Sequence, residues 1–191
     1  MPSEIVKAVI PWQKSRGVVL LADIIGFFPL VARLGADELA PILCDLYGMW
    51  GHEVRKQNGE VVAYVGDSVL AIFRDGACQG KDPEWCATLT AFHLMKGLKK
   101  VRADMEMNVA LHQGEFLEAK WEEQNRLMHN LLGNVVNQAA AMVAGNKPRG
   151  IMATKAVVDV LGPRVKHERC TIRFPSSAQD ETVFRLLSLD L

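Results

Sequence analysis

A run of five apolar residues, Val18 to Ala22, ends at Asp23, and Gly26 follows three positions later. An apolar run of this length is typical of a strand buried on both faces, or of a segment of a core helix. A carboxylate at its end is unfavourable in a core, because burying an unpaired charge costs free energy. The same carboxylate is well placed to bind a metal ion at the edge of a sheet.

A second segment, Val61 to Phe73, repeats this arrangement, with apolar flanks on both sides of a turn that contains Gly66 and Asp67. The glycine permits a tight hairpin turn, which would fix the position of Asp67. Aspartates also cap turns without binding anything, so one such residue would be ordinary. Two aspartates in matching settings, Asp23 and Asp67, predict a shared site.

Composition excludes several classes of protein. The chain has 191 residues, 49% of them hydrophobic, with 22 basic and 22 acidic side chains. This balance gives no net attraction to nucleic acid or to an anionic membrane, and no apolar run approaches the roughly 20 residues that span a bilayer. The four cysteines lack disulfide or zinc spacing, and the N-terminus lacks an apolar signal segment. We expect one cytoplasmic domain over residues 1–191, with reduced thiols.

The pattern of apolar residues predicts strands alternating with helices, and hence an α/β fold, an α+β sandwich. Pro11 is expected to lie in a short leader before the first strand. The segment 105–119 is expected to form two strands on either side of Gly114. The polar segment 120–130 is expected to project from the body. The remaining predicted strands are 18–22, 60–64, 68–73, 150–154, 166–174 and 182–189, and the predicted helices are 36–57, 85–99, 133–144, ended by Gly145 and Pro148, and 155–161.

Five segments, in this order and spacing, resemble the catalytic domain of class III adenylate/guanylate (nucleotidyl) cyclases. The resemblance extends from about Gly17 to Leu187. Each segment is weakly diagnostic alone, but the ordered set is specific. The segments are LLADIIGFFPLVARLGADELAPIL (20–43), NGEVVAYVGDSVLAIF (58–73), NVALHQGEF (108–116), LLGNVVNQAAAM (131–142) and KPRGIMAT (147–154).

The resemblance implies a ferredoxin-like βαββαβ core with a C-terminal strand extension. It also implies a head-to-tail homodimer with two sites at the interface. In each site the 3′-hydroxyl of a nucleoside triphosphate attacks its own α-phosphate, and pyrophosphate leaves. Asp23 and Asp67 carry over as ligands of two Mg²⁺ or Mn²⁺ ions, with the Ile24 carbonyl as a third ligand.

Three further residues carry over as substrate contacts. The backbone amides of Gly26 and Phe27 would receive the triphosphate, and Asn137 would lie beside the ribose and the transition state. His112 also matches a histidine common in the family, and we expect it to pack or hydrogen-bond at its strand end without a catalytic role.

The chain departs from the family where purine cyclases read the base and stabilise the transition state. Ala63 stands where they have Lys or Glu, Asn130 where they have Asp, Thr or Cys, and Ala141 where they have an Arg. A late phosphate-binding Lys is also missing from 173–182. Loss of such an arginine typically costs about a thousandfold or more in rate. Nearby cations that would replace it are Lys120, Arg126 and Lys147.

Three functions remain open. The first is a pyrimidine cyclase, similar to the small bacterial enzymes of anti-phage defence, which makes cyclic UMP or cyclic CMP to activate a separate effector protein. Ala63 leaves no purine-reading side chain, and the amide of Asn130 both donates and accepts hydrogen bonds. The second is a divergent adenylate or guanylate cyclase. The third is a catalytically inactive cyclase-like partner.

Overall fold

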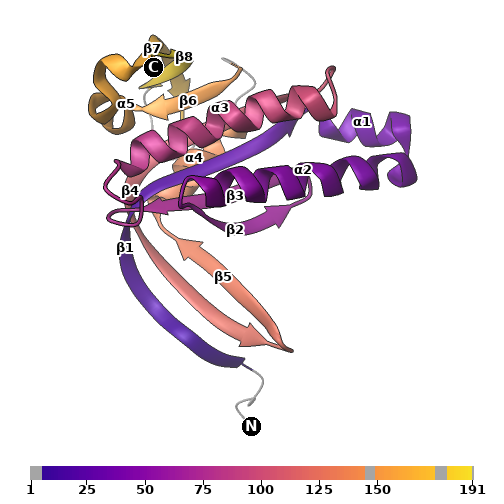
Figure 1. Ribbon diagram of the computed structural model, residues 1–191, viewed down its shortest axis with the longest axis horizontal. Helices are drawn as coiled ribbons and strands as arrows, with labels where there is room; N and C mark the ends of the chain where they lie inside the picture. Colours follow the sequence, from indigo (N-terminus) through magenta and orange to yellow (C-terminus); the bar gives the residue numbers. More distant parts are fainter. Residues whose placement is uncertain (1–5, 145–148, 175–179, 191) are drawn as a thin grey trace.

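A computed structural model describes residues 6–144, 149–174 and 180–190, with the backbone alone for 6–10. Helices cover both faces of one mixed sheet (Figure 1). In chain order the elements are β1 Val6–Ile25, α1 Phe27–Leu34, α2 Ala36–Lys56, β2 Glu60–Val65, β3 Ser68–Arg74, α3 Pro83–Val101, β4 Glu106–Glu123, β5 Arg126–Leu132, α4 Asn134–Ala144, β6 Ile151–Thr154, α5 Lys155–Leu161, a 3-10 turn Gly162–Arg164, β7 Val165–Arg173 and β8 Asp180–Leu189.

The strand order is β2-β3-β1-β4-β6-β8-β7, and β5 pairs with the outer part of β4. Each neighbouring pair among the first four of these strands is antiparallel, and with the intervening helices they form the predicted ferredoxin-like βαββαβ core. β6 then runs parallel to β4, and β8 and β7 extend the sheet. The expected fold class is therefore confirmed.

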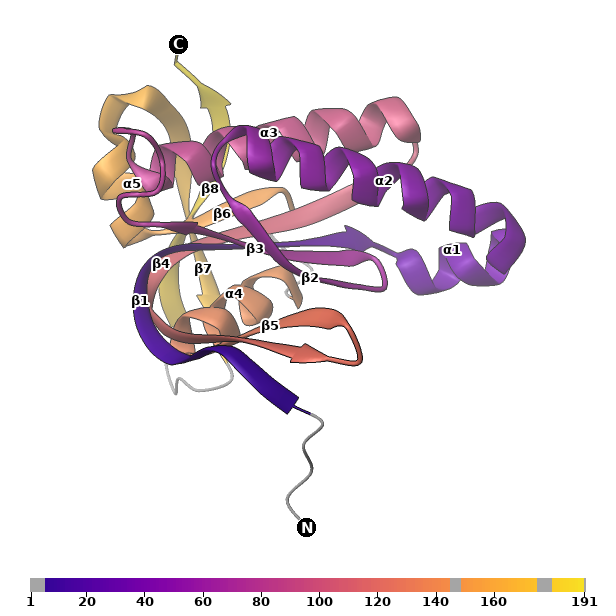
Figure 2. The same ribbon diagram turned by 60° about the horizontal axis from the view of Figure 1, so that its bottom comes forward.

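The sheet separates two hydrophobic layers, which the alternation of side chains along β1 defines. Val18, Leu20 and Ala22 pack with α2 and α3 on one face. Val19 and Leu21 belong to the layer beneath α4 on the other face. Figure 2 shows this division, with α2 and α3 on one side of the sheet and α4 and β5 on the other. We call these the α2/α3 face and the α4 face.

The first strand is longer than predicted. β1 begins at Val6 and includes Pro11, which the sequence places in a leader. The pairing of β1 with β4 shifts register between Ala8 and Ile10 and again between Ile10 and Gln13. Because proline has no N–H to donate, it is tolerated in a strand at such irregular positions.

The prediction of a turn at Gly114 is wrong, because β4 is one continuous strand. Gly114 lies opposite Gly17 in the ladder. A Cβ at Gly114 would lie 3.3 Å from Val135 of α4, so the missing side chain permits close packing of that helix. The polar segment instead forms the end of β4, a turn at Gln124 and Asn125 with positive φ angles, and most of β5. This hairpin, the β4–β5 arm, projects from the body as expected (Figure 1).

The other predicted elements are present with ends shifted by a few residues. α2 ends at Lys56, and Asn58 adopts the left-handed conformation, with φ of 59°. The β2–β3 hairpin turns at Gly66, where φ is 57°. The predicted helix stop at Gly145 and Pro148 lies outside the described residues. Among the described residues, no helix combines the length and apolar character needed to cross a bilayer.

Gly17 tests the packing of β1 against β3. A Cβ on Gly17 would lie 2.2 Å from the carbonyl oxygen of Phe73, which is backbone and cannot move aside. We expect Gly17→Ala to lower the free energy of unfolding by about 3 kcal/mol in urea denaturation, because overpacking forces the strands apart. Gly48→Ala is the control: its Cβ would meet nothing within 4 Å. In an exposed helix that change stabilises by roughly 0.5–1 kcal/mol. Equal effects of the two changes would contradict this packing.

Candidate metal and nucleotide site

The pairing of β1 with β3 brings the two predicted aspartates together. Asp23 lies opposite Ser68, the first residue of β3, and Asp67 directly precedes Ser68 in the turn. The Ser68 hydroxyl donates a hydrogen bond to the Asp23 carboxylate. Side chains alternate along β1, so Asp23 shares the α4 face with Val19 and Leu21.

The electrostatics of Asp67 indicate that the two carboxylates interact. Burial, and then the negative charge of Asp23, raise the pKa of Asp67 to about 6. Hydrogen bonds from the backbone amides of Asp67 and Ile24 oppose this rise in pKa. Two carboxylates in mutual repulsion are stabilised by a cation between them. The arrangement therefore fits a cation.

Two tyrosines fix the turn that carries Asp67. The Tyr47 hydroxyl of α2 donates a hydrogen bond to the carbonyl oxygen of Gly66. The Tyr64 hydroxyl in turn donates to the carbonyl oxygen of Tyr47 at 3.0 Å, and the two rings pack with centroids 4.7 Å apart. The β2–β3 turn is thereby attached to α2, which holds Asp67 in place.

The start of α1 adds hydrogen-bond donors next to Asp23. Gly26 adopts a left-handed conformation, with φ of 71°, and caps the helix that Phe27 begins. The amide of Leu30 donates to the carbonyl oxygen of Gly26 at 3.2 Å, so the amides of Phe27 and Phe28 precede the first turn of helical hydrogen bonds. Pro29 has no N–H. Such amides at a helix N-terminus favour anions.

The donors at this site are hard oxygens, which Mg²⁺ and Mn²⁺ prefer. The carboxylates of Asp23 and Asp67 would hold the ions. Ile24 lies one residue beyond the last β1–β3 pair, where its carbonyl would be a further ligand. Within the described residues no group of three or more His, Cys, Asp or Glu side chains forms a metal cluster. The predicted site uses two carboxylates per chain.

The other predicted substrate residues lie apart from the carboxylates. Asn137 is exposed on α4 and makes no hydrogen bond within the described residues, and Ala141 follows it one helical turn later. Asn130 is exposed on β5, where its side-chain oxygen accepts a hydrogen bond from the Leu131 amide at 2.8 Å. Ala63 on β2 lies opposite Leu70, which packs in the layer on the α4 face. In the described part of one chain, neither aspartate contacts Asn130 or Asn137 through a hydrogen bond.

His112 forms hydrogen bonds, as the sequence predicts, but it lies inside β4 and not at a strand end. Its ring nitrogens contact Thr154 of β6 at 3.1 Å and the side-chain oxygen of Gln138 of α4. Burial lowers the pKa of His112, which favours the neutral ring. The ring therefore links β4 to the helix that carries Asn137.

A network of charged side chains on the α4 face, which we call the arm network, was not predicted from the sequence. Its centre is Glu118 of β4, which is only 1% exposed. Arg74 of β3 donates to Glu118 at 2.8 and 2.5 Å and to Glu60 of β2 at 2.9 Å. Lys120 also donates to Glu60, and His129 of β5 lies 3.2 Å from Glu118. The network attaches the arm to the β2–β3 hairpin.

The network also bears on the cations considered as replacements for the missing arginine. The amine of Lys120 is held by Glu60 within its own chain. Arg126 is exposed at the start of β5, and its side chain forms no hydrogen bond or ion pair with the described residues. Lys147 lies outside the described residues. Of the two described candidates, Arg126 is therefore the one whose charged group is not held by an acidic side chain of the described residues.

The chain belongs to the adenylate and guanylate cyclase catalytic domain family, whose sequence model matches residues 12–183. An uncharacterized protein of Mycobacterium tuberculosis is 26% identical over 145 residues, which are 74% of this chain and 27% of that protein. An adenylate cyclase of Anabaena cylindrica is 23% identical over 157 residues, 75% of this chain and 30% of that protein. The chain thus matches less than a third of the length of these relatives.

Solved structures share the fold. The adenylyl cyclase CyaB of P. aeruginosa superposes with a TM-score of 0.85 at 18% identity, covering 95% of this chain and 98% of that one. The guanylyl cyclase Cya2 superposes with a TM-score of 0.83 at 17% identity, covering 94% and 95%. These similarities establish the fold alone.

Substitution of Glu118 tests the arm network through the pH dependence of the free energy of unfolding. Hydrogen bonds from Arg74 lower the pKa of Glu118 to about 2, against an ordinary value of 4.5. A carboxylate whose pKa falls on folding stabilises the protein above its unfolded pKa. That stabilisation, about 3 kcal/mol here, is lost as the pH falls from about 4.5 towards 2. We expect Glu118→Gln to lose about this much stability at pH 7 in urea denaturation, with a smaller further loss on acidification than the unmodified protein.

Glu115→Gln is the matched control, because Glu115 lies on the same strand in an exposed ion pair with Lys14 at 2.7 Å. The two side chains are 59% and 68% exposed, so the pair contributes at most about 1 kcal/mol. A similar loss of stability in both variants would argue against the network.

Proposed function

We propose that the chain is a nucleotidyl cyclase domain that converts a nucleoside triphosphate to its 3′,5′-cyclic monophosphate and pyrophosphate. The observation that carries the proposal is the pairing of Asp23 with Asp67 next to the open amides of α1. Membership of the cyclase family and the adenylate cyclase name of the Anabaena relative support it. Nucleoside triphosphates are intracellular metabolites, so the proposal places the reaction of the 1–191 domain in the cytoplasm.

Each residue has a distinct task in this reaction. Asp23 and Asp67 hold two divalent ions, with the carbonyl of Ile24 as a further ligand. Such ions, when bound, activate the attacking 3′-oxygen and neutralise charge on the phosphates. The α1 amides, beginning at Gly26 and Phe27, bind the triphosphate and align its α-phosphate with the ribose. Asn137 orients the ribose by hydrogen bonding.

The site requires a second copy of the chain. Within the described part of one chain, Asn137 and Asn130 form no hydrogen bond with either aspartate, so we propose that a partner supplies them. The β4–β5 arm offers an interface: Leu117, Met128 and Leu132 lie on one side of this hairpin and are 39%, 39% and 59% exposed. Burying such an apolar surface favours association. We therefore propose a head-to-tail homodimer with two sites at its interface.

For the base we propose a pyrimidine, UTP or CTP. Ala63 has no group to read a purine edge, and Asn130 carries an uncharged amide that both donates and accepts. The cyclic pyrimidine would act as a messenger in anti-phage defence by activating an effector protein. Asn130 is also compatible with the second candidate function, that of a divergent adenylate or guanylate cyclase. The similarity to the adenylate cyclase of Anabaena favours this second function. Ala141 favours the third, an inactive partner, unless another cation replaces the arginine.

The substrate is tested by incubating the purified protein with Mn²⁺ and each of ATP, GTP, CTP and UTP, with product identification by mass spectrometry. We expect cyclic UMP or cyclic CMP, and a loss of at least about a hundredfold in Asp67→Asn, which removes a metal ligand. Asp75→Asn, in the exposed turn after β3, is the control and should retain activity. A cyclic purine would support the second candidate. No product from a folded, dimeric protein would support the third.

The shared site is tested by mixing two inactive variants, Asp67→Asn and Asn137→Ala. In a head-to-tail dimer each site takes the aspartate from one chain and the asparagine from the other. Equal mixing gives half heterodimers with one intact site of two, so activity should recover to roughly a quarter of the unmodified level. Recovery that stays at the level of the separate variants would contradict a site built from two chains.

A further inference from the structure

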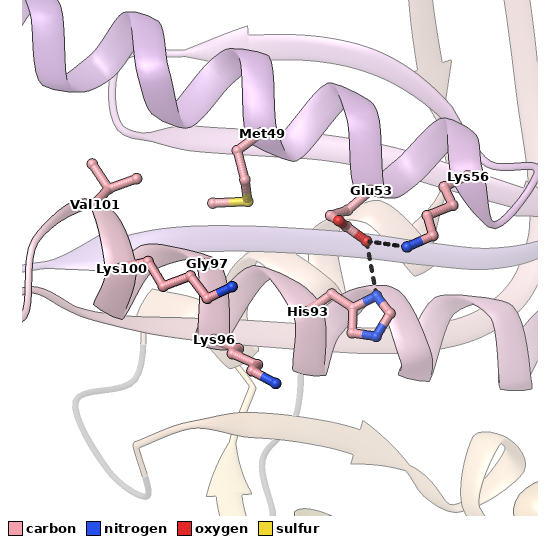
Figure 3. A pocket seen from close by; sticks show the side chains of 8 residues that line it. All are labelled: Met49, Glu53, Lys56, His93, Lys96, Gly97, Lys100 and Val101. Atoms are coloured by element: carbon pink, nitrogen blue, oxygen red, sulfur yellow. Dashed lines mark hydrogen bonds and ion pairs between the residues drawn. The ribbon is translucent and has the colours of Figure 1, made fainter.

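A pocket of about 400 Å³ lies between α2 and α3, away from the proposed catalytic site (Figure 3). Asp23 points to the α4 face, whereas α2 and α3 cover the opposite face of the sheet (Figure 2). The pocket and the Asp23 carboxylate are therefore on opposite sides of the sheet. The lining residues that matter here are Met49, Glu53 and Lys56 of α2 and His93, Lys96 and Lys100 of α3.

The pocket concentrates positive charge in a chain whose formal net charge is zero. Three lysines line it against a single carboxylate, Glu53. That carboxylate is already shared, because its oxygen lies 2.8 Å from the Nδ1 atom of His93 and 4.0 Å from the Nζ atom of Lys56 (Figure 3). The pocket thus has an excess of cations that Glu53 does not neutralise.

Two of these cations have no partner among the residues that the structure describes. Lys96 and Lys100 form no hydrogen bond or ion pair with the described residues, and they are four residues apart on one helix. Like charges at this spacing repel each other, which destabilises a helix. By contrast, the neighbouring Lys99 donates a hydrogen bond to the carbonyl oxygen of Ala103 at 3.1 Å. An anion between Lys96 and Lys100 would remove the repulsion.

The base of the pocket depends on a small residue. A Cβ at Gly97 would lie 2.6 Å from the sulfur of Met49. The glycine therefore lets Met49 of α2 reach α3 at Gly97, beside the charged groups, as Figure 3 shows. The result is a cationic rim around an apolar floor, in a cavity of the size that small ligands occupy.

We propose that this pocket binds a small multivalent anion of the phosphate type, held by Lys96, Lys100 and Lys56. The volume and the single, compact cluster of cations fit a phosphorylated small molecule better than a long acidic segment of another protein. This proposal is independent of the catalytic one, since none of the residues that line the pocket belongs to the proposed catalytic site.

The test titrates inorganic pyrophosphate into the full chain by calorimetry, at fixed ionic strength and with EDTA present to remove divalent ions from the carboxylate site. Removing two of the three lysine charges in Lys96→Gln/Lys100→Gln should weaken binding by at least about tenfold. Lys81→Gln/Lys166→Gln is the matched control, because it removes the same charge from exposed positions outside the pocket. Its dissociation constant should change by less than about twofold, since screened charges at a distance contribute little.

Amide shifts in an NMR titration locate the ligand independently of the variants. Pyrophosphate should perturb α2 and α3 near Glu53 and Gly97. Absence of binding to the unmodified protein, equal weakening in both double variants, or shifts confined to α1 and the β2–β3 turn would each overturn the proposal. Binding of an acidic peptide but not of pyrophosphate would overturn it in favour of a protein partner.

Discussion

The antiparallel register of β1 against β3 is the constraint on which the candidate site depends. It places Asp23 opposite Ser68, and so beside Asp67 in the adjoining turn. A slip of one residue would rotate Asp23 to the α2/α3 face, where apolar helices would cover it. Register is held by the two hydrophobic layers and by Gly17, whose missing side chain permits the close approach of Phe73. The packing of the core therefore determines where the two carboxylates meet.

The arm network connects this core to β2 and β5, the strands that carry the positions proposed to read the base. Glu60 lies on β2 three residues before Ala63, and His129 directly precedes Asn130 on β5. Arg74 and Glu118 join these strands through hydrogen bonds. A buried carboxylate is costly unless it is paired, so the network constrains both strands together. Ala63 and Asn130, the positions proposed to contact the base, are thus fixed relative to each other.

Much of the fold could be predicted from the sequence because its signals are local. Apolar runs, the Asn58 helix end and the Gly66 turn predict α2, β2, β3 and the second part of β1, and the family segments imply the ferredoxin-like core. The turn predicted at Gly114 is wrong because a glycine occurs at close helix contacts as well as in turns. Only the position of Val135 in the structure distinguishes the two cases. The burial of Glu118 and the pairing of Lys120 with Glu60 could not be predicted, because both depend on how β2 and β3 pack beside β4. The α2–α3 pocket likewise depends on two helices separated in sequence.

The central claim is that Asp23 and Asp67 form a divalent metal site, and Mn²⁺ binding followed by electron paramagnetic resonance tests it most directly. The full chain should bind Mn²⁺, and Asp67→Asn should weaken that binding by at least about tenfold, because one of two anionic ligands is lost. Asp75 is an exposed aspartate that lies 3.7 Å from Arg16. The Asp75→Asn variant should therefore bind Mn²⁺ as the unmodified protein does. Equal Mn²⁺ affinity in all three proteins would contradict the account.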